Sequence, residues 1–213
     1  MPKRVLNLHH DTVVLEEDAQ PGPYACVSHC WGKSKRPTVA LKSTSEEYKI
    51  GIPFRKLSKT FRDAVDISRR SDISYLWIDS PCIIQNSNED WNEEAVKMGD
   101  IYAHAHFTIA ATGADDSSGG CYRDRDPACV SFGTVAEGLV YVRKNVPSIN
   151  DVSAHTRPLL TRAWTFQEML LSTRVTHFTA EDVIWQCNEC QRSESRENMK
   201  EYYKEPGRKL ARG

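Results

Sequence analysis

Short apolar runs alternate with longer amphipathic stretches along this chain. Residues 24–28, 73–78 and 107–111 are rich in β-branched, aromatic or small apolar residues, and each predicts a strand. Between them, residues 60–68 and 87–102 carry apolar side chains at helical spacing. The first helix shows Phe61, Ala64, Val65 and Ser68 on one face, and the second shows Trp91, Ala95, Met98 and Tyr102, which we expect in the core.

Capping patterns mark where these two helices begin. Thr60 is followed three residues later by Asp63, and Ser87 is followed in the same way by Asp90. Each pair predicts a capping box at a helix N-terminus.

The rest of the sequence predicts further elements, either less strongly or nearer the C-terminus. Residues 4–15 predict one or two strands, and residues 139–142 can form another. Residues 161–172 predict a helix, followed by strands at 174–178 and 183–186 that suggest a hairpin. Alternating strands and helices predict an α/β fold with a mostly parallel sheet flanked by helices and with additional C-terminal strands. We expect one domain over residues 1–190, followed by a charged tail or the start of a C-terminal region at 191–213.

Composition narrows the class of protein. The chain has 213 residues, of which 39% are hydrophobic and 27% charged, as in a globular domain. Lys and Arg (28) nearly balance Asp and Glu (29), so nothing indicates a nucleic-acid-binding surface. No apolar run reaches the ~20 residues of a membrane helix. There is no signal-peptide pattern, so we expect a cytoplasmic protein.

The cysteines do not predict a metal site. There are seven, and Cys187 and Cys190 form one C-x-x-C pair with no second pair. A zinc site would need Cys26, Cys30 or a histidine from a distant part of the chain. Buried thiols are the preferred interpretation, and we expect no metal.

Polar clusters follow two of the predicted strands. Ser28, His29, Trp31 and Gly32 come after the first strand, and Asp79 comes after the second. Ligands of α/β sheets bind beyond the carboxyl ends of the strands, so these residues predict a site there. Gly32 permits close approach of a ligand, and loop amides can hold phosphate. Trp31 as a core anchor is an alternative.

Taken together, the segments VSHCWG (27–32), YLWIDSPCIIQNSNEDW (75–91), MGDIYAHAHFTIAAT (98–112) and PLLTRAWTFQEMLLSTRVTHF (158–178) resemble the heterokaryon-incompatibility (HET) domain of filamentous fungi. The resemblance covers residues 4–187. Pro81 and Asn86 depart from it, because the family usually has Leu and an acidic residue there.

The resemblance implies an effector of regulated cell death after non-self recognition. The family is distantly similar to TIR domains, which have a flavodoxin-like fold. Some TIR domains hydrolyse NAD, whereas others act only through assembly. NAD is therefore an expected substrate rather than a cofactor, and a self-association module with a recognition partner protein is the alternative.

Glu168 is the first catalytic candidate. It lies in the helix predicted at 161–172, four residues after Trp164 and beside Gln167, so Trp164 and Glu168 share a helix face. A buried carboxylate can stabilise the oxocarbenium-like sugar that forms when an N-glycosidic bond breaks, and the indole can stack on a ring. A solvated glutamate on an amphipathic helix is the alternative.

The remaining candidates have two interpretations each. Asp79 either binds a hydroxyl group or caps the next segment, and Arg162 pairs with phosphate or with an acidic residue such as Asp79. Gln85 either binds the ligand or forms a turn, and Gln167 is a further candidate for binding the substrate. A thiol nucleophile at Cys82 with His29 as base is a weaker hypothesis, because no third residue orients the pair.

Overall fold

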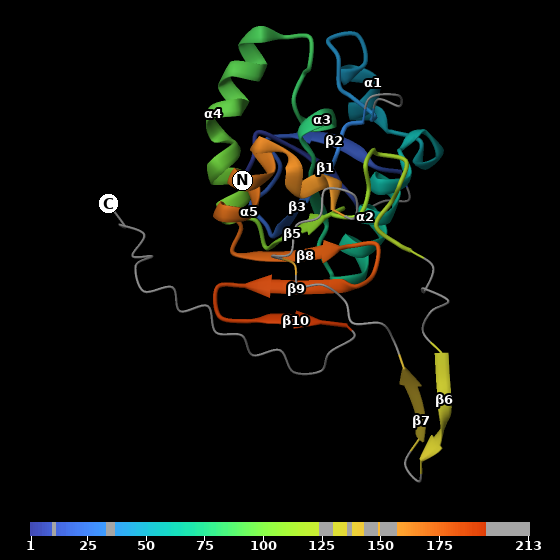
Figure 1. Ribbon diagram of the computed structural model, residues 1–213. Coiled ribbons are helices and arrows are strands. Elements are labelled where there is room, and N and C mark those ends of the chain that lie inside the picture. The colour runs from blue at the N-terminus through green and yellow to red at the C-terminus, as the bar shows by residue number, and fades with distance from the viewer. Residues whose placement is uncertain are drawn as a thin grey trace, which may run out of the picture.

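The computed structural model describes residues 1–9, 12–32, 37–123, 130–135, 138–142, 149 and 157–194, with backbone alone for the 130–135 and 138–142 strands. Its main body is an eight-stranded sheet with the strand order β10-β9-β8-β5-β3-β4-β1-β2 (Figure 1). Within the described residues, no helix combines the length and the apolar character that crossing a lipid bilayer requires.

Four parallel strands form the centre of the sheet. They are β3 (Tyr24–Ser28), β4 (Tyr75–Trp77), β5 (Phe107–Ala110) and β8 (Arg174–Phe178). All residues of β3 and β5 are buried, as expected for strands covered on both faces. Cys26 lies at the centre, opposite Trp77 on one side and Thr108 on the other.

Antiparallel strands complete both edges. At one edge β1 (Arg4–Asn7) pairs with β4 and with β2 (Val14–Glu17). At the other, β8 pairs with β9 (Val183–Cys187), which pairs with β10 (Gln191–Ser193). The α/β class and the additional C-terminal strands are confirmed, but the sheet is mixed, because only the central pairings are parallel.

The connections place helices on both faces of the sheet. The chain passes from β3 to β4 through α2 (Lys59–Arg70), then crosses back over β3 to β5 through α4 (Asn88–His104). Because such crossovers are right-handed, the two helices lie on opposite faces. The next crossover continues in the same direction through α5 (Ala163–Leu171), which packs beside α4 (Figure 1). The connections diverge at β3, a switch point where α/β sheets bind ligands.

Short elements connect these units. They are α1 (Ser45–Ile50), the 3₁₀ turns η1 (Phe54–Lys56) and η2 (Pro158–Thr161), and the single-turn helix α3 (Asp79–Cys82). A separate two-stranded sheet contains β6 (Val130–Val135) and β7 (Gly138–Val142), so the strand expected near 139–142 is confirmed.

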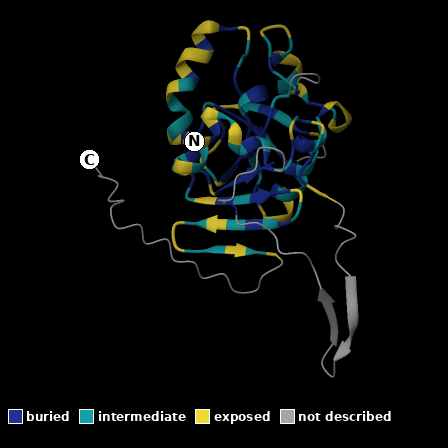
Figure 2. Ribbon diagram, in the orientation of Figure 1, coloured by how far each residue is buried: buried dark blue, intermediate teal, exposed yellow. Residues whose placement is uncertain are grey.

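Burial follows the predicted face of α2 but only part of that of α4, where Tyr102 is buried and Met98 packs against the core (Figure 2). Phe61, Ala64, Val65 and Ser68 are buried as expected. In α4, however, Trp91 is 46% exposed, and the buried residues are Asp90, Glu94, Ile101 and Tyr102. The core expectation was therefore wrong for Trp91, because the buried face of α4 meets a buried arginine, Arg4, rather than an apolar surface.

Both predicted capping boxes need correction. The helix α2 begins at Lys59 after Ser58, and the Thr60 hydroxyl instead accepts the Gly120 amide. Ser87 does precede α4, but it makes no side-chain cap, and Asp90 binds Arg4 and the Ile84 amide.

The strand β10 also bears on the expected domain boundary. It shows that the sheet extends to Ser193, into the segment expected to begin the tail. Residues 195–213 lie outside the described part of the chain.

Candidate active site

Three segments that are distant in the sequence meet at the carboxyl end of β3. Ser28 is the last residue of β3, Asp79 begins α3 just after β4, and Glu168 comes from α5. The Ser28 hydroxyl donates a hydrogen bond to Glu168 Oε2 across 140 residues of sequence. The side chains of Ser28, Asp79 and Glu168 therefore lie together in one cluster.

Glu168 is the central titratable group of this cluster. Burial raises the pKa of Glu168 to about 7, and the nearby Asp79 carboxylate adds to the increase, while Ser28, Arg162 and Tyr102 oppose it. The carboxyl group therefore exchanges its proton near neutral pH, where a catalytic acid or base works best. Such a pKa distinguishes it from a solvated glutamate.

The Tyr102 hydroxyl is a partner of Glu168 that the sequence interpretation missed. It lies 3.1 Å from the Val27 carbonyl oxygen and also hydrogen-bonds Glu168. Tyr102 was expected in the core, and it is buried there. A buried tyrosine needs a partner for its hydroxyl, which is the signal that could have indicated this contact.

Asp79 organises the loop that follows β3. Its Oδ2 accepts a hydrogen bond from Trp31 Nε1 at 2.9 Å, and its Oδ1 accepts the Ser80 amide at 2.7 Å. Asp79 therefore caps the segment that follows, one of its two predicted roles. The same carboxylate fixes the orientation of the Trp31 indole, which is partly exposed.

His29 lies behind this loop. Its Nδ1 is 3.8 Å from Asp79 Oδ1, and its ring packs edge-to-face against Phe61 with 4.9 Å between the centroids. Burial lowers the pKa of His29, so the imidazole is neutral at pH 7. Gly32 has a φ of 77°, in the left-handed region that favours glycine, so the loop leaves β3 through a turn that needs this residue.

Arg162 and Trp164 border the cluster from the start of α5. The Arg162 guanidinium donates to the His29 carbonyl oxygen, and it makes no ion pair with Asp79 among the described residues. The structural ion pair considered from the sequence is therefore not formed. Trp164 lies on the same helix face as Glu168 and is 56% exposed, so its indole is open to a ligand.

Two predicted binding residues lie apart from the cluster. The Gln85 side-chain amide donates to the carbonyl oxygens of Asp79 and Ile83 at 3.0 Å, which is the turn-forming alternative. Gln167 is exposed and lies against Gly99 of α4, because neighbouring helix residues point in different directions. Their binding roles stay predictions.

Cys82 has the properties of a structural thiol. It is fully buried, and burial raises its pKa to about 12, so it stays protonated near neutral pH. A thiolate nucleophile at this position is therefore not supported.

The two departures from the family pattern are accommodated by the structure. Pro81 lies in the first turn of α3, where a missing amide hydrogen costs no helical bond. Asn86 is exposed, and its Oδ1 accepts the Lys42 amide at 2.8 Å, a bond that a carboxylate oxygen can equally accept.

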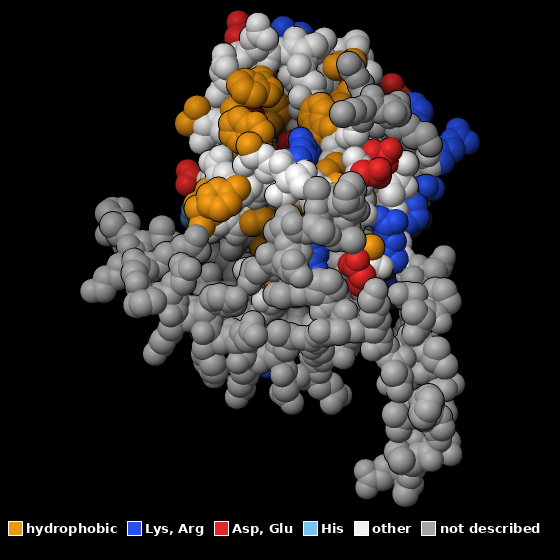
Figure 3. All heavy atoms as spheres, viewed as in Figure 1, with side chains coloured by type: hydrophobic (Ala, Val, Ile, Leu, Met, Phe, Trp, Pro, Cys, Tyr) orange, Lys and Arg blue, Asp and Glu red, His pale blue; other side chains and the backbone are white. Residues whose placement is uncertain are grey.

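The surroundings of the cluster combine charge and apolar surface. In Figure 3, side chains of both charges lie recessed between hydrophobic groups on the face that α5 occupies. Within the described residues, no three His, Cys, Asp or Glu side chains gather closely enough to hold a metal ion.

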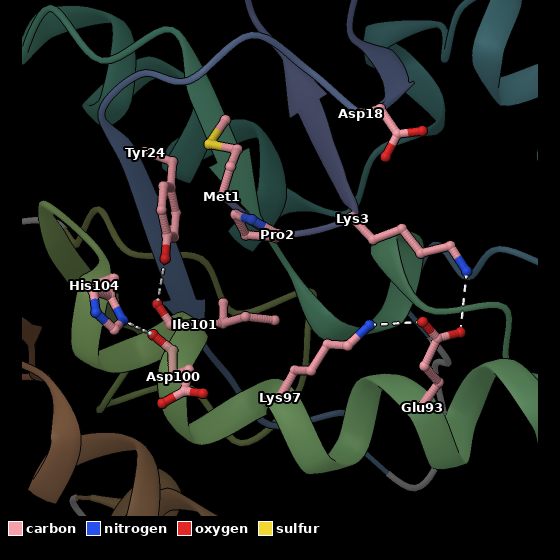
Figure 4. Close-up of a pocket in the computed structure, with 10 residues that line it drawn as sticks. All are labelled: Met1, Pro2, Lys3, Asp18, Tyr24, Glu93, Lys97, Asp100, Ile101 and His104. Atoms are coloured by element: carbon pink, nitrogen blue, oxygen red, sulfur yellow. Dashed lines mark hydrogen bonds and ion pairs between the residues drawn. The ribbon is translucent and has the colours of Figure 1, made fainter. Parts of the chain in front are cut away.

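A cavity of about 690 Å³ lies at the opposite end of β3 (Figure 4). It is bordered by Tyr24, by the N-terminal residues and by α4. Its polar groups largely satisfy one another, as Lys97 and Lys3 both bind Glu93. The Glu168 cluster is the candidate site, because the candidate catalytic groups predicted from the sequence lie there and not around this cavity.

Comparison with known proteins agrees with this arrangement. The family described as "Heterokaryon incompatibility protein (HET)" matches residues 24–168, which include every element of the cluster. The chain belongs to the HET family. In this HET domain, the strands β1, β2 and β8 to β10 complete the sheet outside the matched region.

One curated relative has a similar sequence. It is "Heterokaryon incompatibility protein 6, OR allele" of Neurospora crassa, 30% identical over 106 residues. The match covers 46% of this chain and 16% of the relative, so the matched segment is a small part of that protein's length. No solved structure matches the chain.

Proposed function

We propose that this HET domain is an effector of fungal non-self recognition and cell death that acts in the cytoplasm by hydrolysing NAD. The role in incompatibility comes from the family and from the name of the Neurospora crassa relative. The observation that supports the chemistry is Glu168, a partly buried carboxyl group with a pKa of about 7 at the carboxyl end of β3.

The proposed reaction breaks the bond between the nicotinamide nitrogen and C1′ of the ribose. The bonding electrons move to the ring nitrogen, so nicotinamide leaves as a neutral molecule and needs no proton. An oxocarbenium-like sugar remains, and the ionised Glu168 carboxylate stabilises its positive charge. Water then adds at C1′ and gives its proton to a base, which yields ADP-ribose.

Neighbouring residues fit the parts of this substrate. The exposed Trp164 indole can stack on the nicotinamide ring, one turn from Glu168. Arg162 is half-buried and has guanidinium hydrogens beyond the one that binds His29, so it can pair with the pyrophosphate. Ser28 and Tyr102 hold the carboxyl group in place.

The test is nicotinamide release from NAD by the full chain at high protein concentration. Glu168→Gln keeps the size of the side chain but removes its charge, and we expect it to lower the rate by about 100-fold or more. Glu89→Gln, the same change at an exposed position of α4, should leave the rate unchanged. The wild-type rate should rise with pH to a plateau above about pH 7, because the ionised form of Glu168 is active.

A second candidate function is a non-catalytic assembly module. Phe166 and Leu170 are 70% and 40% exposed, and they form a face of α5 separate from the one that carries Trp164 and Glu168. Exposed apolar surface of this kind can mediate self-association or docking of a recognition partner.

The two functions can be separated on the same helix. Phe166→Ser should abolish self-association, measured by light scattering, if α5 is an assembly surface. A folded, self-associated wild-type protein that releases no nicotinamide would contradict the enzyme and favour the assembly module.

A further inference from the structure

Two cysteines lie together at the hairpin between β9 and β10. Cys187 ends β9, and Cys190 immediately precedes β10. Their Sγ atoms are 3.7 Å apart, and the Cys187 amide donates to the Cys190 carbonyl oxygen at 2.9 Å. Both side chains are partly exposed, whereas the other cysteines of the described part of the chain, Cys26, Cys30, Cys82 and Cys121, are buried.

The turn already holds the two sulfur atoms in non-bonded contact. A disulfide bond needs about 2.05 Å between them, so the atoms must approach by about 1.7 Å. Rotation of the two side chains can supply part of this movement. The backbone is already in place, because both residues lie at the ends of paired strands. Gln191 faces Gln186, and Arg192 faces Trp185, on either side of the turn.

The two thiols differ in their surroundings. Burial acts against ionisation of Cys187, but hydrogen bonds from the backbone of Glu189 and Cys190 and from the Cys190 thiol together outweigh it and lower the pKa of Cys187. The hydrogen bond with Cys187, together with burial, raises the pKa of Cys190. Cys187 is therefore the better nucleophile, and Cys190 is placed to react second.

We propose that Cys187 and Cys190 form a redox-active dithiol, which a small disulfide such as glutathione disulfide oxidises to an intramolecular disulfide bond. The Cys187 thiolate attacks one sulfur of glutathione disulfide and releases one glutathione thiolate. Cys190 then loses its proton to solvent and attacks Cys187 Sγ, which releases the second glutathione thiolate. The two cysteines lose two electrons, and glutathione disulfide gains them.

The position of this pair gives the oxidation a structural consequence. Cys187 lies opposite Arg174, the first residue of β8. Arg174 comes only three residues after the end of α5. Among the described strands β10 pairs only with β9, so it is an edge strand that can separate easily. A disulfide bond across the turn would hold β10 on the sheet. The proposal does not rest on NAD hydrolysis.

The experiment exposes the full-length, reduced protein to glutathione disulfide and maps the products by peptide mass spectrometry. We expect a Cys187–Cys190 disulfide in the wild-type chain, reversed by dithiothreitol. Cys190→Ser should instead accumulate one glutathione attached to Cys187. Cys187→Ser should form no intramolecular disulfide and should accumulate one glutathione attached to Cys190, because losing Cys187 also removes the hydrogen bond that raises the pKa of Cys190.

Hydrogen exchange supplies a second measurement on the same samples. Oxidation should slow exchange of the Glu194 amide, which donates to the Val183 carbonyl oxygen of β9 at 2.9 Å. The Cys187→Ser/Cys190→Ser double variant should show no change. Glutathione attached to both cysteines of the wild-type chain without a bond between them, oxidation at a buried cysteine instead, or a tightly retained zinc ion that prevents oxidation would each overturn the proposal.

Discussion

Glu168 ionises within the folded protein at a cost in free energy. Its pKa is about 7, compared with 4.5 for a free glutamate side chain, a difference of about 2.5 units. One pKa unit corresponds to 1.36 kcal/mol, so an upper bound is about 3 kcal/mol, and partial exposure reduces it to about 1–2 kcal/mol. The native state binds this proton more tightly than the unfolded chain does.

The sign of the pH dependence follows from this difference. Between pH 4.5 and 7 the native state holds more protons than the unfolded state, so the contribution of Glu168 to stability falls as the pH rises through this range. Glu168→Gln cannot ionise. We therefore predict that the free energy of unfolding of the variant, relative to that of the wild type, rises by about 1–2 kcal/mol from pH 4 to pH 8, measured by urea denaturation.

Subtracting the stability of the wild type from that of Glu168→Gln at each pH removes the contribution of the other titrating groups. Glu89→Gln is a suitable control, and its difference from the wild type should stay small throughout. A constant difference for Glu168→Gln over the same pH range would contradict the raised pKa and the catalytic assignment that depends on it.

Only some of the contacts of these residues could be predicted from sequence. Ser28 and Asp79 were placed together because strand order brings carboxyl ends to one edge of the sheet, whereas Glu168 was chosen from its predicted helix and its neighbours Trp164 and Gln167. The bond between Trp31 and Asp79 could not be inferred, since it depends on a loop turning at Gly32. Gln85 was assigned to the site for its chemistry, but its amide is used by nearby carbonyl groups.

At the scale of elements, a buried arginine connects β1 to α3 and α4. Arg4 is 2% exposed, and its guanidinium binds Asp90, Glu17 and the Cys82 carbonyl oxygen. Glu94 is also fully buried nearby. Charges buried in this way are stable only while each has its partner.

We predict that Arg4→Leu destabilises the domain by about 3–5 kcal/mol, because Asp90 then lies buried without its main counter-charge. The pairing of Asp90 with Lys3 at 3.5 Å offsets only part of this loss. Thermal or urea unfolding measures the change. The matched control is Lys49→Leu, which removes an exposed partner of Glu17 and should cost less than about 1 kcal/mol.

A double variant checks the mechanism. Arg4→Leu/Asp90→Leu should be more stable than the sum of the two single changes implies, since it leaves no unpaired charge at the contact. Strict additivity would show that the two side chains act independently.

This network also explains why the face of α4 was mispredicted. Helical periodicity identifies a buried face by its apolar residues, and Trp91 and Ala95 suggested one face. The structure buries Asp90 and Glu94 instead. Arg4, from a strand 86 residues earlier, is the partner of Asp90, and Lys97 of the same helix pairs with Glu94 at 3.2 Å. Such a pairing between distant segments leaves no local signal.

At the scale of the whole molecule, the sheet extends beyond the region that matches the family. Residues 24–168 contain β3, β4 and β5 of the eight-stranded sheet but omit the strands that cover the outer edges of β4 and β5. The sequence did predict the order of the central strands and helices along the chain. At one edge, β8 and β9 form the hairpin that the sequence suggested. At the other edge, β1 joins the sheet by pairing Leu6 with Leu76 of β4, a contact between distant segments that a local pattern does not show.

We predict that a fragment limited to residues 24–168 is insoluble or aggregates, because both edges of its parallel core are unpaired. Residues 1–194, which retain both edges, should be soluble and unfold cooperatively. Expression followed by size-exclusion chromatography and circular dichroism tests this. A soluble, cooperatively folded 24–168 fragment would contradict it.

The late position of β8 also matters while the chain is being made. Between Ala110 and Arg174 the ribosome adds 64 residues, which takes roughly 3–13 s at typical translation rates. For that time the newly made β5 has no neighbour on one side and exposes a hydrophobic strand to other nascent chains. The yield of active protein therefore depends on the speed of synthesis across this segment and on the chaperones that cover it.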